Sequence, residues 1–221
     1  MKGGAVKKIK VALVDDHAVV RMGLRYALSL FKDIELVGEL EDGEGAAALV
    51  RSTGADVTLL DIRMPGKDGI AALGEILAAD PAAKVVMLTT SSMEEDVYAA
   101  LNAGAKGYVL KDRNPEYIVK AVRAVAEGGT FIPDDIKAIY KARSEEPELT
   151  SAEREAVELL VQGLSNKAIA ERLGISEDGV KVRLKHAYEK LGVGDRAGAI
   201  SVAVRRGIAL PAGMSSRITN D

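Results

Sequence analysis

The fold is decided by one stretch of sequence, Val57-Thr58-Leu59-Leu60-Asp61-Ile62-Arg63-Met64-Pro65-Gly66. In this stretch an apolar run of strand length ends on a carboxylate, and a turn containing Pro and Gly follows at once. A second apolar run, residues 9–14, ends on the pair Asp15-Asp16 in the same way. Adjacent parallel strands would bring these three acids to one edge of a sheet, where they repel each other unless a cation lies between them. The pattern therefore predicts a divalent metal ion beside a reactive aspartate.

Short apolar runs alternate with helical patterns through the first 129 residues. Strands are expected at 9–14, 34–39, 57–61, 84–89 and 107–110, and helices near 17–31, 43–53, 69–79, 94–103 and 114–128. The strands are almost continuously apolar, which is typical of a parallel sheet with helices on both faces. Residues 1–129 are therefore predicted to form an α/β domain, a doubly wound five-stranded parallel sheet.

The rest of the chain has a different pattern. Residues 130–148 are polar, include two prolines and predict a linker around a short helical stretch. From 149 to 210 the period is helical throughout, which predicts a small all-α domain, and residues 211–221 are expected to be a disordered tail. Residues 149–221 carry 11 Lys and Arg against 9 Asp and Glu, whereas residues 1–148 carry 19 against 24. The mildly basic second part favours a polyanionic partner.

The composition excludes several classes of protein. Of the 221 residues, 48% are hydrophobic and 29% charged, and no apolar run reaches the roughly 18 residues of a membrane span. The absence of cysteine excludes disulfides and thiolate metal sites. The N-terminal residues lack the long apolar segment of a secretory signal, so a cytoplasmic location without membrane contact is expected.

Polar side chains follow four of the predicted strands, at the edge where doubly wound sheets collect their chemistry. These strand ends are Asp15-Asp16, Asp61, Thr89-Thr90 and Lys111-Asp112. Taken singly, each is more common as a turn residue, a strand former or a solvated charge. Together they favour phosphoryl transfer to Asp61, with Mg²⁺ on the carboxylates, Lys111 neutralising the moving charge and Thr89 donating a hydrogen bond.

The first domain resembles the receiver domain of bacterial two-component response regulators, a flavodoxin-like fold. The resemblance covers residues 8–128 and rests on Asp15-Asp16-His17, Leu60 to Gly69, Leu88-Thr89 and Gly104 to Asp112. The resemblance implies that Asp61 is the phosphoacceptor and that Lys111 senses the phosphate. It implies that Asp16, Asp61 and the Arg63 carbonyl hold Mg²⁺ with help from Asp15. It further implies that Thr89 and Tyr108 form a switch pair. It also allows a cis bond between Lys111 and Asp112. A receiver of this kind is not an enzyme, although it can slowly remove its own phosphoryl group.

The helical part contains an ordered series of caps. Thr150 is followed three residues later by Glu153, as in a capping box, and Ser165, Gly174 and Ser176 start, end and start the next two helices. A short helix, a glycine turn and a capped helix predict a helix-turn-helix. The last of these helices, residues 177–191, carries basic side chains that could contact phosphates and base edges in a major groove, although a basic helix alone is more often a solvated face.

Residues 149–210 resemble the LuxR-type helix-turn-helix, and the two resemblances together identify the chain as a member of the NarL/FixJ family of response regulators. They imply that Asn166 and Lys167 lie near phosphates, and that Lys181, Val182 and Lys185 face the groove, Val182 against a thymine methyl. Arg183 belongs to the same basic helix. Three positions depart from the family pattern: Gly179 replaces Thr, Arg183 replaces His, and Ala187 replaces a larger apolar residue.

The predicted function is a phosphorylation-dependent, DNA-binding transcription regulator. Its expected partners are a sensor histidine kinase, double-stranded DNA and, when phosphorylated, a second copy of the chain, with Mg²⁺ as cofactor. Two alternatives stay open. One is an adaptor that acts through protein contacts, favoured by the departures at Gly179 and Arg183. The other is a phosphohydrolase with Asp61 as nucleophile, which is disfavoured because Arg63 occupies the place where such enzymes usually carry a second acid.

Overall fold

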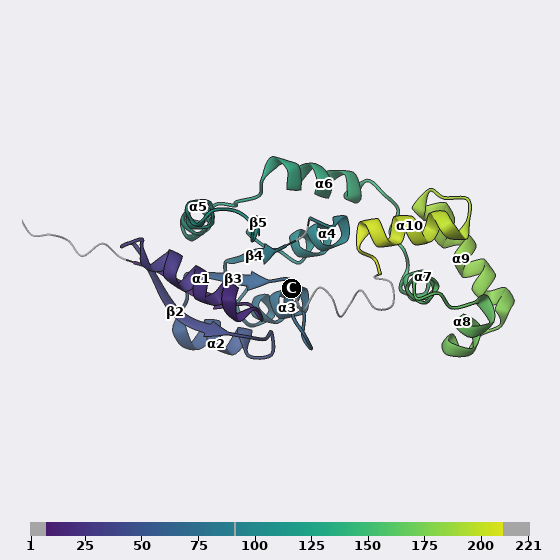
Figure 1. Ribbon diagram of the computed structural model, residues 1–221, viewed down its shortest axis with the longest axis horizontal. Coiled ribbons are helices and arrows are strands. Elements are labelled where there is room, and N and C mark those ends of the chain that lie inside the picture. Colours follow the sequence, from purple (N-terminus) through teal and green to yellow (C-terminus); the bar gives the residue numbers. More distant parts are fainter. Residues whose placement is uncertain (1–7, 91, 210–221) are drawn as a thin grey trace, which may run out of the picture. The chain divides into compact units, whose positions relative to one another are not determined.

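The computed structural model describes residues 8–90 and 92–209 (Figure 1). The chain divides into two compact units, one made of residues 1–92 and 99–138 and the other of residues 93–98 and 139–221. Each unit is described by itself below. Within the described ranges, no helix has the length and apolarity needed to cross a membrane.

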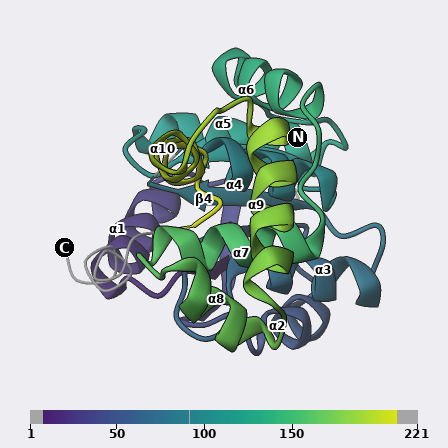
Figure 2. The same ribbon diagram turned by 90° about the vertical axis from the view of Figure 1, so that its right-hand side faces the viewer.

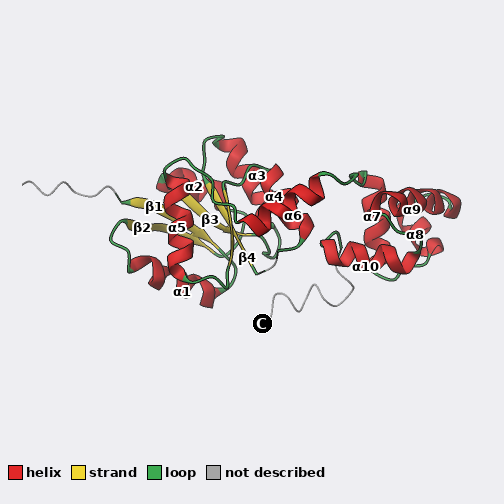
Figure 3. Cartoon of the chain, turned by 90° about the horizontal axis from the view of Figure 1, so that it is seen from above, coloured by secondary structure: helices red, strands yellow, loops and turns green. Residues whose placement is uncertain are grey.

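The first unit is built on a five-stranded parallel sheet in the order β2-β1-β3-β4-β5. The strands are β1 (Ile9–Val14), β2 (Ile34–Leu40), β3 (Val57–Asp61), β4 (Val85–Thr89) and β5 (Gly107–Leu110). Figure 3 shows the strands enclosed by helices. The predicted α/β fold is therefore confirmed, with strand bounds within one residue of those expected.

Five helices connect and follow these strands: α1 (Ala18–Ser29), α2 (Ala46–Thr53), α3 (Gly69–Ala79), α4 (Glu94–Asn102) and α5 (Pro115–Ala126). Helices α1 and α5 contact each other, as do α2 and α3. The core on the side of α1 and α5 is formed by alternate strand residues, among them Leu13, Leu59, Leu88 and Val109. Since successive side chains of a strand point to opposite faces, this set defines one face of the sheet.

The outer edge of β5 is paired with the segment that follows α5. Gly107 and Phe131 form an isolated parallel bridge. The Tyr108 N–H donates to the Phe131 carbonyl at 3.0 Å, and the Phe131 N–H donates to the Lys106 carbonyl at 2.8 Å. Helix α6 (Asp134–Ser144) comes next, inside the segment predicted as a linker with a short helical stretch.

The second unit contains a helix-turn-helix among α7 (Ser151–Val161), α8 (Asn166–Leu173), α9 (Glu177–Leu191) and α10 (Arg196–Arg206), seen face-on in Figure 2. The predicted caps are present: Thr150 and Glu153 form a capping box, and the Ser165 and Ser176 side chains accept backbone N–H groups. Gly174 ends α8 with a φ of 64°, a conformation that glycine adopts without strain. The buried stripe of α9 is Val180, Leu184, Ala187 and Leu191. The predicted tail at 211–221 lies outside the described residues.

Candidate functional site

Strand register brings the predicted acids together. Val14 of β1 pairs with Leu60 of β3, so that Asp15 and Asp61 follow at neighbouring positions. Thr89 of β4 pairs with Leu110 of β5, so that Lys111 comes next along the same edge. Asp15, Asp61 and Lys111 each lie two residues after a strand residue that faces α1 and α5, namely Leu13, Leu59 and Val109. Their side chains therefore share one side of the sheet.

Lys111 is the counterion of the two buried acids. Its ammonium nitrogen lies 2.6 Å from Asp61 Oδ2 and 2.8 Å from Asp15 Oδ2. Asp15 and Asp61 are 0% and 2% exposed, which excludes bulk water from the contacts. Buried carboxylates of this kind require a partner, because an unpaired charge in the interior is strongly destabilising.

The environment tunes the phosphoacceptor candidate. Burial raises the pKa of Asp61 to about 6, against the opposing pull of the Lys111 ammonium, and the neighbouring Asp15 carboxylate adds to the rise. The Arg63 N–H donates to Asp61 Oδ1 at 3.2 Å and favours the ionised form. A carboxylate in this state is ionised at neutral pH yet poorly solvated, which suits a nucleophile.

Two residues of the turn after β3 explain why the sequence there is so specific. A side chain on Gly69 would place its Cβ 1.9 Å from the Asp61 carbonyl oxygen, so glycine alone fits against that backbone. The Gly69 N–H donates to the Ile62 carbonyl at 2.9 Å, and the Asp68 side chain caps α3 through the Ala71 N–H at 2.8 Å. The start of α3 is thereby fixed to the strand that carries Asp61.

His17 also belongs to this cluster, although no separate role was predicted for it. Its Nδ1 lies 2.7 Å from Asp16 Oδ1, 3.5 Å from Asp15 Oδ1 and 3.8 Å from Asp61 Oδ2. One ligand atom from each of Asp15, Asp16, His17 and Asp61 falls within 4.8 Å of the others, so this set could hold a metal ion. The available signal was the position of His17 directly after the acid pair.

Of the three remaining predicted receiver residues, two lie on the sheet face opposite to the cluster and one adjoins it. Thr89 and Tyr108 are completely buried, and alternation places both on the sheet face opposite to Leu88 and Val109. Arg63 is adjacent to the cluster through its backbone N–H. The hypothesis of a cis bond after Lys111 is wrong, because no cis peptide bond occurs in residues 8–90 and 92–209. Position 112 is Asp, and outside proline the trans form is favoured by about 2.5–4 kcal/mol.

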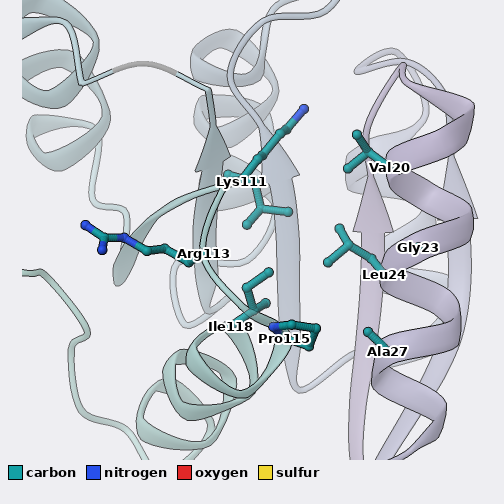
Figure 4. A pocket seen from close by; sticks show the side chains of 9 residues that line it. Val20, Gly23, Leu24, Ala27, Lys111, Arg113, Pro115 and Ile118 are labelled. Carbon is teal, nitrogen blue, oxygen red and sulfur yellow. The ribbon is translucent and has the colours of Figure 1, made fainter.

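A largely apolar cavity of about 270 Å³ lies beside the cluster, between α1 and the start of α5. Val20, Leu24 and Ala27 of α1 line one side, and Ile118 lines the other (Figure 4). Lys111 lies at one end, with its ammonium group pointing out of the cavity toward the acids. Lys111 therefore lines this cavity while its charge is held by Asp15 and Asp61.

The predicted nucleic-acid residues lie on the outer surfaces of α8 and α9. Lys167, Lys181, Val182 and Lys185 are exposed, whereas Asn166 and Arg183 are partly buried. Val182 is 53% exposed and is the one large apolar side chain with high exposure in the described part of the second unit. Lys181 forms an exposed ion pair with Asp178 at 2.8 Å, a kind of contact that contributes little to stability.

Comparisons with known proteins match both units. Residues 11–123 match the model of the response regulator receiver domain, and residues 147–203 match that of the bacterial regulatory proteins of the luxR family. The uncharacterized transcriptional regulatory protein YxjL of Bacillus subtilis is 38% identical, over 91% of this chain and 97% of that protein. The nitrate/nitrite response regulator protein NarL of Escherichia coli is 36% identical, over 84% and 90%.

Solved structures give the same picture. A structure of two RcsB dimers bound to two parallel DNAs is similar at a TM-score of 0.64 and 27% identity, covering 90% of this chain and 98% of the RcsB chain. The similarity covers both units of the chain, so the two proteins share the same two folds in the same order along the sequence.

Proposed function

We propose that this chain, which belongs to the NarL/FixJ family of two-component response regulators and is a DNA-binding transcription regulator, is switched by phosphorylation of Asp61. The observation that carries the proposal is the position of the Lys111 ammonium, 2.6 Å from Asp61 and 2.8 Å from Asp15, at a buried edge of the sheet. We assign the receiver to residues 1–129, the linker to 130–148 and the DNA-binding domain to 149–210.

The chemistry follows from the groups at this edge. A carboxylate oxygen of Asp61 attacks the phosphorus of a phosphohistidine or of a small acyl phosphate. An O–P bond forms on Asp61 while the bond from phosphorus to the donor breaks. Lys111 then neutralises negative charge on the transferred group, a contribution that a buried site makes larger. The receiver accepts the group rather than turning over a substrate.

The donor set fits a hard divalent cation. Asp15, Asp16 and Asp61 provide carboxylate oxygens within reach of one point, and the Arg63 carbonyl is the further ligand that the family pattern implies. Mg²⁺ bound there would supply positive charge to the phosphoryl oxygens. Thr89 and Tyr108 are the proposed switch pair, which would report the new charge to the rest of the domain.

The protein donor is proposed to approach over α1. Three large apolar side chains on this helix and one at its C-cap are exposed, at 77% for Val19, 59% for Met22, 70% for Tyr26 and 62% for Leu30. At about 100° per residue they fall within an arc of roughly 80°, so they form one stripe. A contiguous apolar stripe beside a reactive site is typical of a protein interface, here that of a sensor histidine kinase.

The output is proposed to be binding of phosphorylated homodimers to paired DNA half-sites. We assign Lys181, Val182 and Lys185, which are exposed on α9, to a major groove, and Asn166 and Lys167 to the phosphates. Arg183 belongs to the same basic helix. The RcsB structure supports this assignment, since it contains two RcsB dimers bound to two parallel DNAs. No observation favours the adaptor alternative. Because the proposed partner is promoter DNA, we place the protein in the cytoplasm.

Labelling with acetyl phosphate tests the site. The wild-type chain should take up one phosphoryl group in the presence of Mg²⁺, and Asp61→Asn should take up none. Asp42→Asn, which changes an exposed aspartate outside the cluster, is the matched control and should label like wild type. Full labelling of Asp61→Asn would refute the assignment.

A second experiment separates the donor surface from the chemistry. Tyr26→Glu in the α1 stripe should slow transfer from the phosphorylated cognate kinase while leaving labelling by acetyl phosphate unchanged, because the small donor needs no docking surface. Equal loss with both donors would instead place Tyr26 in the fold or the phosphorylation site.

A further inference from the structure

The imidazole of His17 is turned into the acidic cluster rather than toward solvent. The His17 backbone N–H donates to Asp15 Oδ1 at 2.9 Å, which fixes the start of this side chain beside the buried acid. Its Nδ1 then approaches oxygens of all three acids, at 2.7 Å from Asp16, 3.5 Å from Asp15 and 3.8 Å from Asp61. The His17 side chain is 27% exposed, so most of the ring is shielded.

The closest of these approaches is not a hydrogen bond. Although His17 Nδ1 and Asp16 Oδ1 are 2.7 Å apart, neither atom has a hydrogen-bond partner among the described residues, and both are shielded from solvent. Buried polar atoms almost always form hydrogen bonds. Two such atoms that lie close together without being aligned as donor and acceptor therefore need an explanation. A metal ion bound by both atoms would explain the arrangement.

The distances from His17 Nδ1 to the three acids are short enough for ligands that share one ion. With metal–ligand bonds of about 2.1 Å, adjacent ligands of an octahedral ion lie about 3.0 Å apart and opposite ligands about 4.2 Å apart. The distance of 2.7 Å from His17 Nδ1 to Asp16 is close to the value for adjacent ligands, and the distances of 3.5 Å to Asp15 and 3.8 Å to Asp61 lie between the two values. His17 Nδ1 is therefore placed as an additional ligand of the ion that the three carboxylates would hold.

The nature of this ligand bears on which ion is preferred. Mg²⁺ takes oxygen ligands, whereas imidazole nitrogen suits the first-row transition ions, whose affinities for mixed nitrogen and oxygen sites generally increase from Mn²⁺ onward. We propose that His17 is a metal ligand of the Asp61 cluster, and that it makes this receiver prefer a first-row transition ion such as Mn²⁺ over Mg²⁺. The inference rests on the proposed metal-assisted phosphorylation of Asp61, and it adds a fourth protein ligand and a preference among the divalent ions that the site could hold.

A different role for His17 makes the opposite prediction. A protonated imidazole could act as a counterion for Asp16, as Lys111 does for Asp15 and Asp61. Such a cation would compete with any metal, so that its removal would raise the affinity for Mn²⁺ and Mg²⁺ alike. Loss of a ligand lowers the affinity for Mn²⁺ more than that for Mg²⁺.

The test uses the full-length protein with Mn²⁺ and Mg²⁺ as probes. The Mn²⁺ affinity and its competition by Mg²⁺ are measured for wild type, His17→Asn and His186→Asn. His186 is the other histidine of the chain, is exposed on α9 and serves as the matched control. Electron spin-echo modulation of bound Mn²⁺ reports whether a nitrogen is directly coordinated, and circular dichroism checks that each variant is folded.

We expect nitrogen modulation in wild type and in His186→Asn but not in His17→Asn, together with a fall of about 10-fold or more in the preference for Mn²⁺ over Mg²⁺ in His17→Asn. Bound Mn²⁺ without nitrogen modulation in wild type, or tighter binding of both ions by His17→Asn, overturns the inference while leaving the phosphorylation site intact. Should wild type bind neither ion and take no label from acetyl phosphate, the proposed function itself fails.

Discussion

The raised pKa of Asp61 makes the stability of the receiver depend on pH in a definite direction. Burial lifts this pKa from its ordinary value of 3.8 to about 6, so the folded state holds the proton more tightly than the unfolded state does. The resulting stabilisation is complete when the pH is below the Asp61 pKa of the unfolded state, and it is lost as the pH rises through the Asp61 pKa of the folded state. A difference of about two pKa units corresponds to roughly 3 kcal/mol in total, of which about 1.4 kcal/mol is lost between about pH 5 and pH 8.

Asp61→Asn removes this dependence, because asparagine does not titrate in either state. The free energy of unfolding of the variant, relative to wild type, should therefore rise by about 1.4 kcal/mol between about pH 5 and pH 8. Urea unfolding followed by circular dichroism, in buffer with a chelator, measures the difference at each pH. Comparing the stability difference between pH values cancels any effect of the substitution that does not depend on protonation of Asp61.

An independent signal comes from the Arg63 amide, which donates to Asp61 Oδ1 at 3.2 Å. Its proton chemical shift should titrate with a midpoint near the Asp61 pKa in wild type and should be flat in Asp61→Asn. A stability difference that stays constant or moves in favour of wild type as the pH rises would refute the reasoning that burial dominates at this site.

Five further substitutions test other parts of the account by urea unfolding. Gly69→Ala should lower the free energy of unfolding by at least about 3 kcal/mol, since the new Cβ would lie 1.9 Å from the Asp61 carbonyl oxygen. Gly74→Ala, on the same helix with no neighbour within 4 Å, should raise it by about 0.5–1 kcal/mol. Lys111→Met leaves two buried carboxylates without their cation and should lose about 3–5 kcal/mol near pH 8, but less near pH 5, where Asp61 is mostly protonated. Gly179→Ala should stabilise α9 by about 0.5–1 kcal/mol, because the new Cβ finds no atom closer than 3.4 Å; a loss would contradict this. Thr150→Ala removes the cap of α7 and should lose about 1 kcal/mol, and an unchanged midpoint would show that Glu153 satisfies this helix end alone.

Most elements of the fold could be predicted because local signals agree with the tertiary structure. Helix α9 has the predicted bounds, since Ser176 and Gly192 cap its two ends. The start of α2 was predicted three residues too early, at 43 rather than at Ala46. No side chain caps this helix, and its N-cap is Gly45, so the sequence there lacked the usual signal of a helix start.

The candidate site was predictable where it follows strand ends, and less so where it depends on side-chain direction. Parallel register alone brings Asp15, Asp61 and Lys111 to one edge, and period-two alternation puts them on one face. The inward turn of His17 depends on a backbone hydrogen bond to Asp15, which no pattern of residue types specifies. The space around Gly69 is likewise a property of the folded turn.

The pairing of Phe131 with β5 has a consequence for self-association. Unpaired strand edges invite other chains to extend a sheet, which proteins avoid by covering or charging them. Here the first half of β5 already has its outward backbone groups bonded to Phe131, and the opposite edge strand, β2, carries Glu35 and Glu39. Both flanks of the sheet are thus protected by different means, so two copies of this regulator would meet through helices and not through a continuous intermolecular sheet.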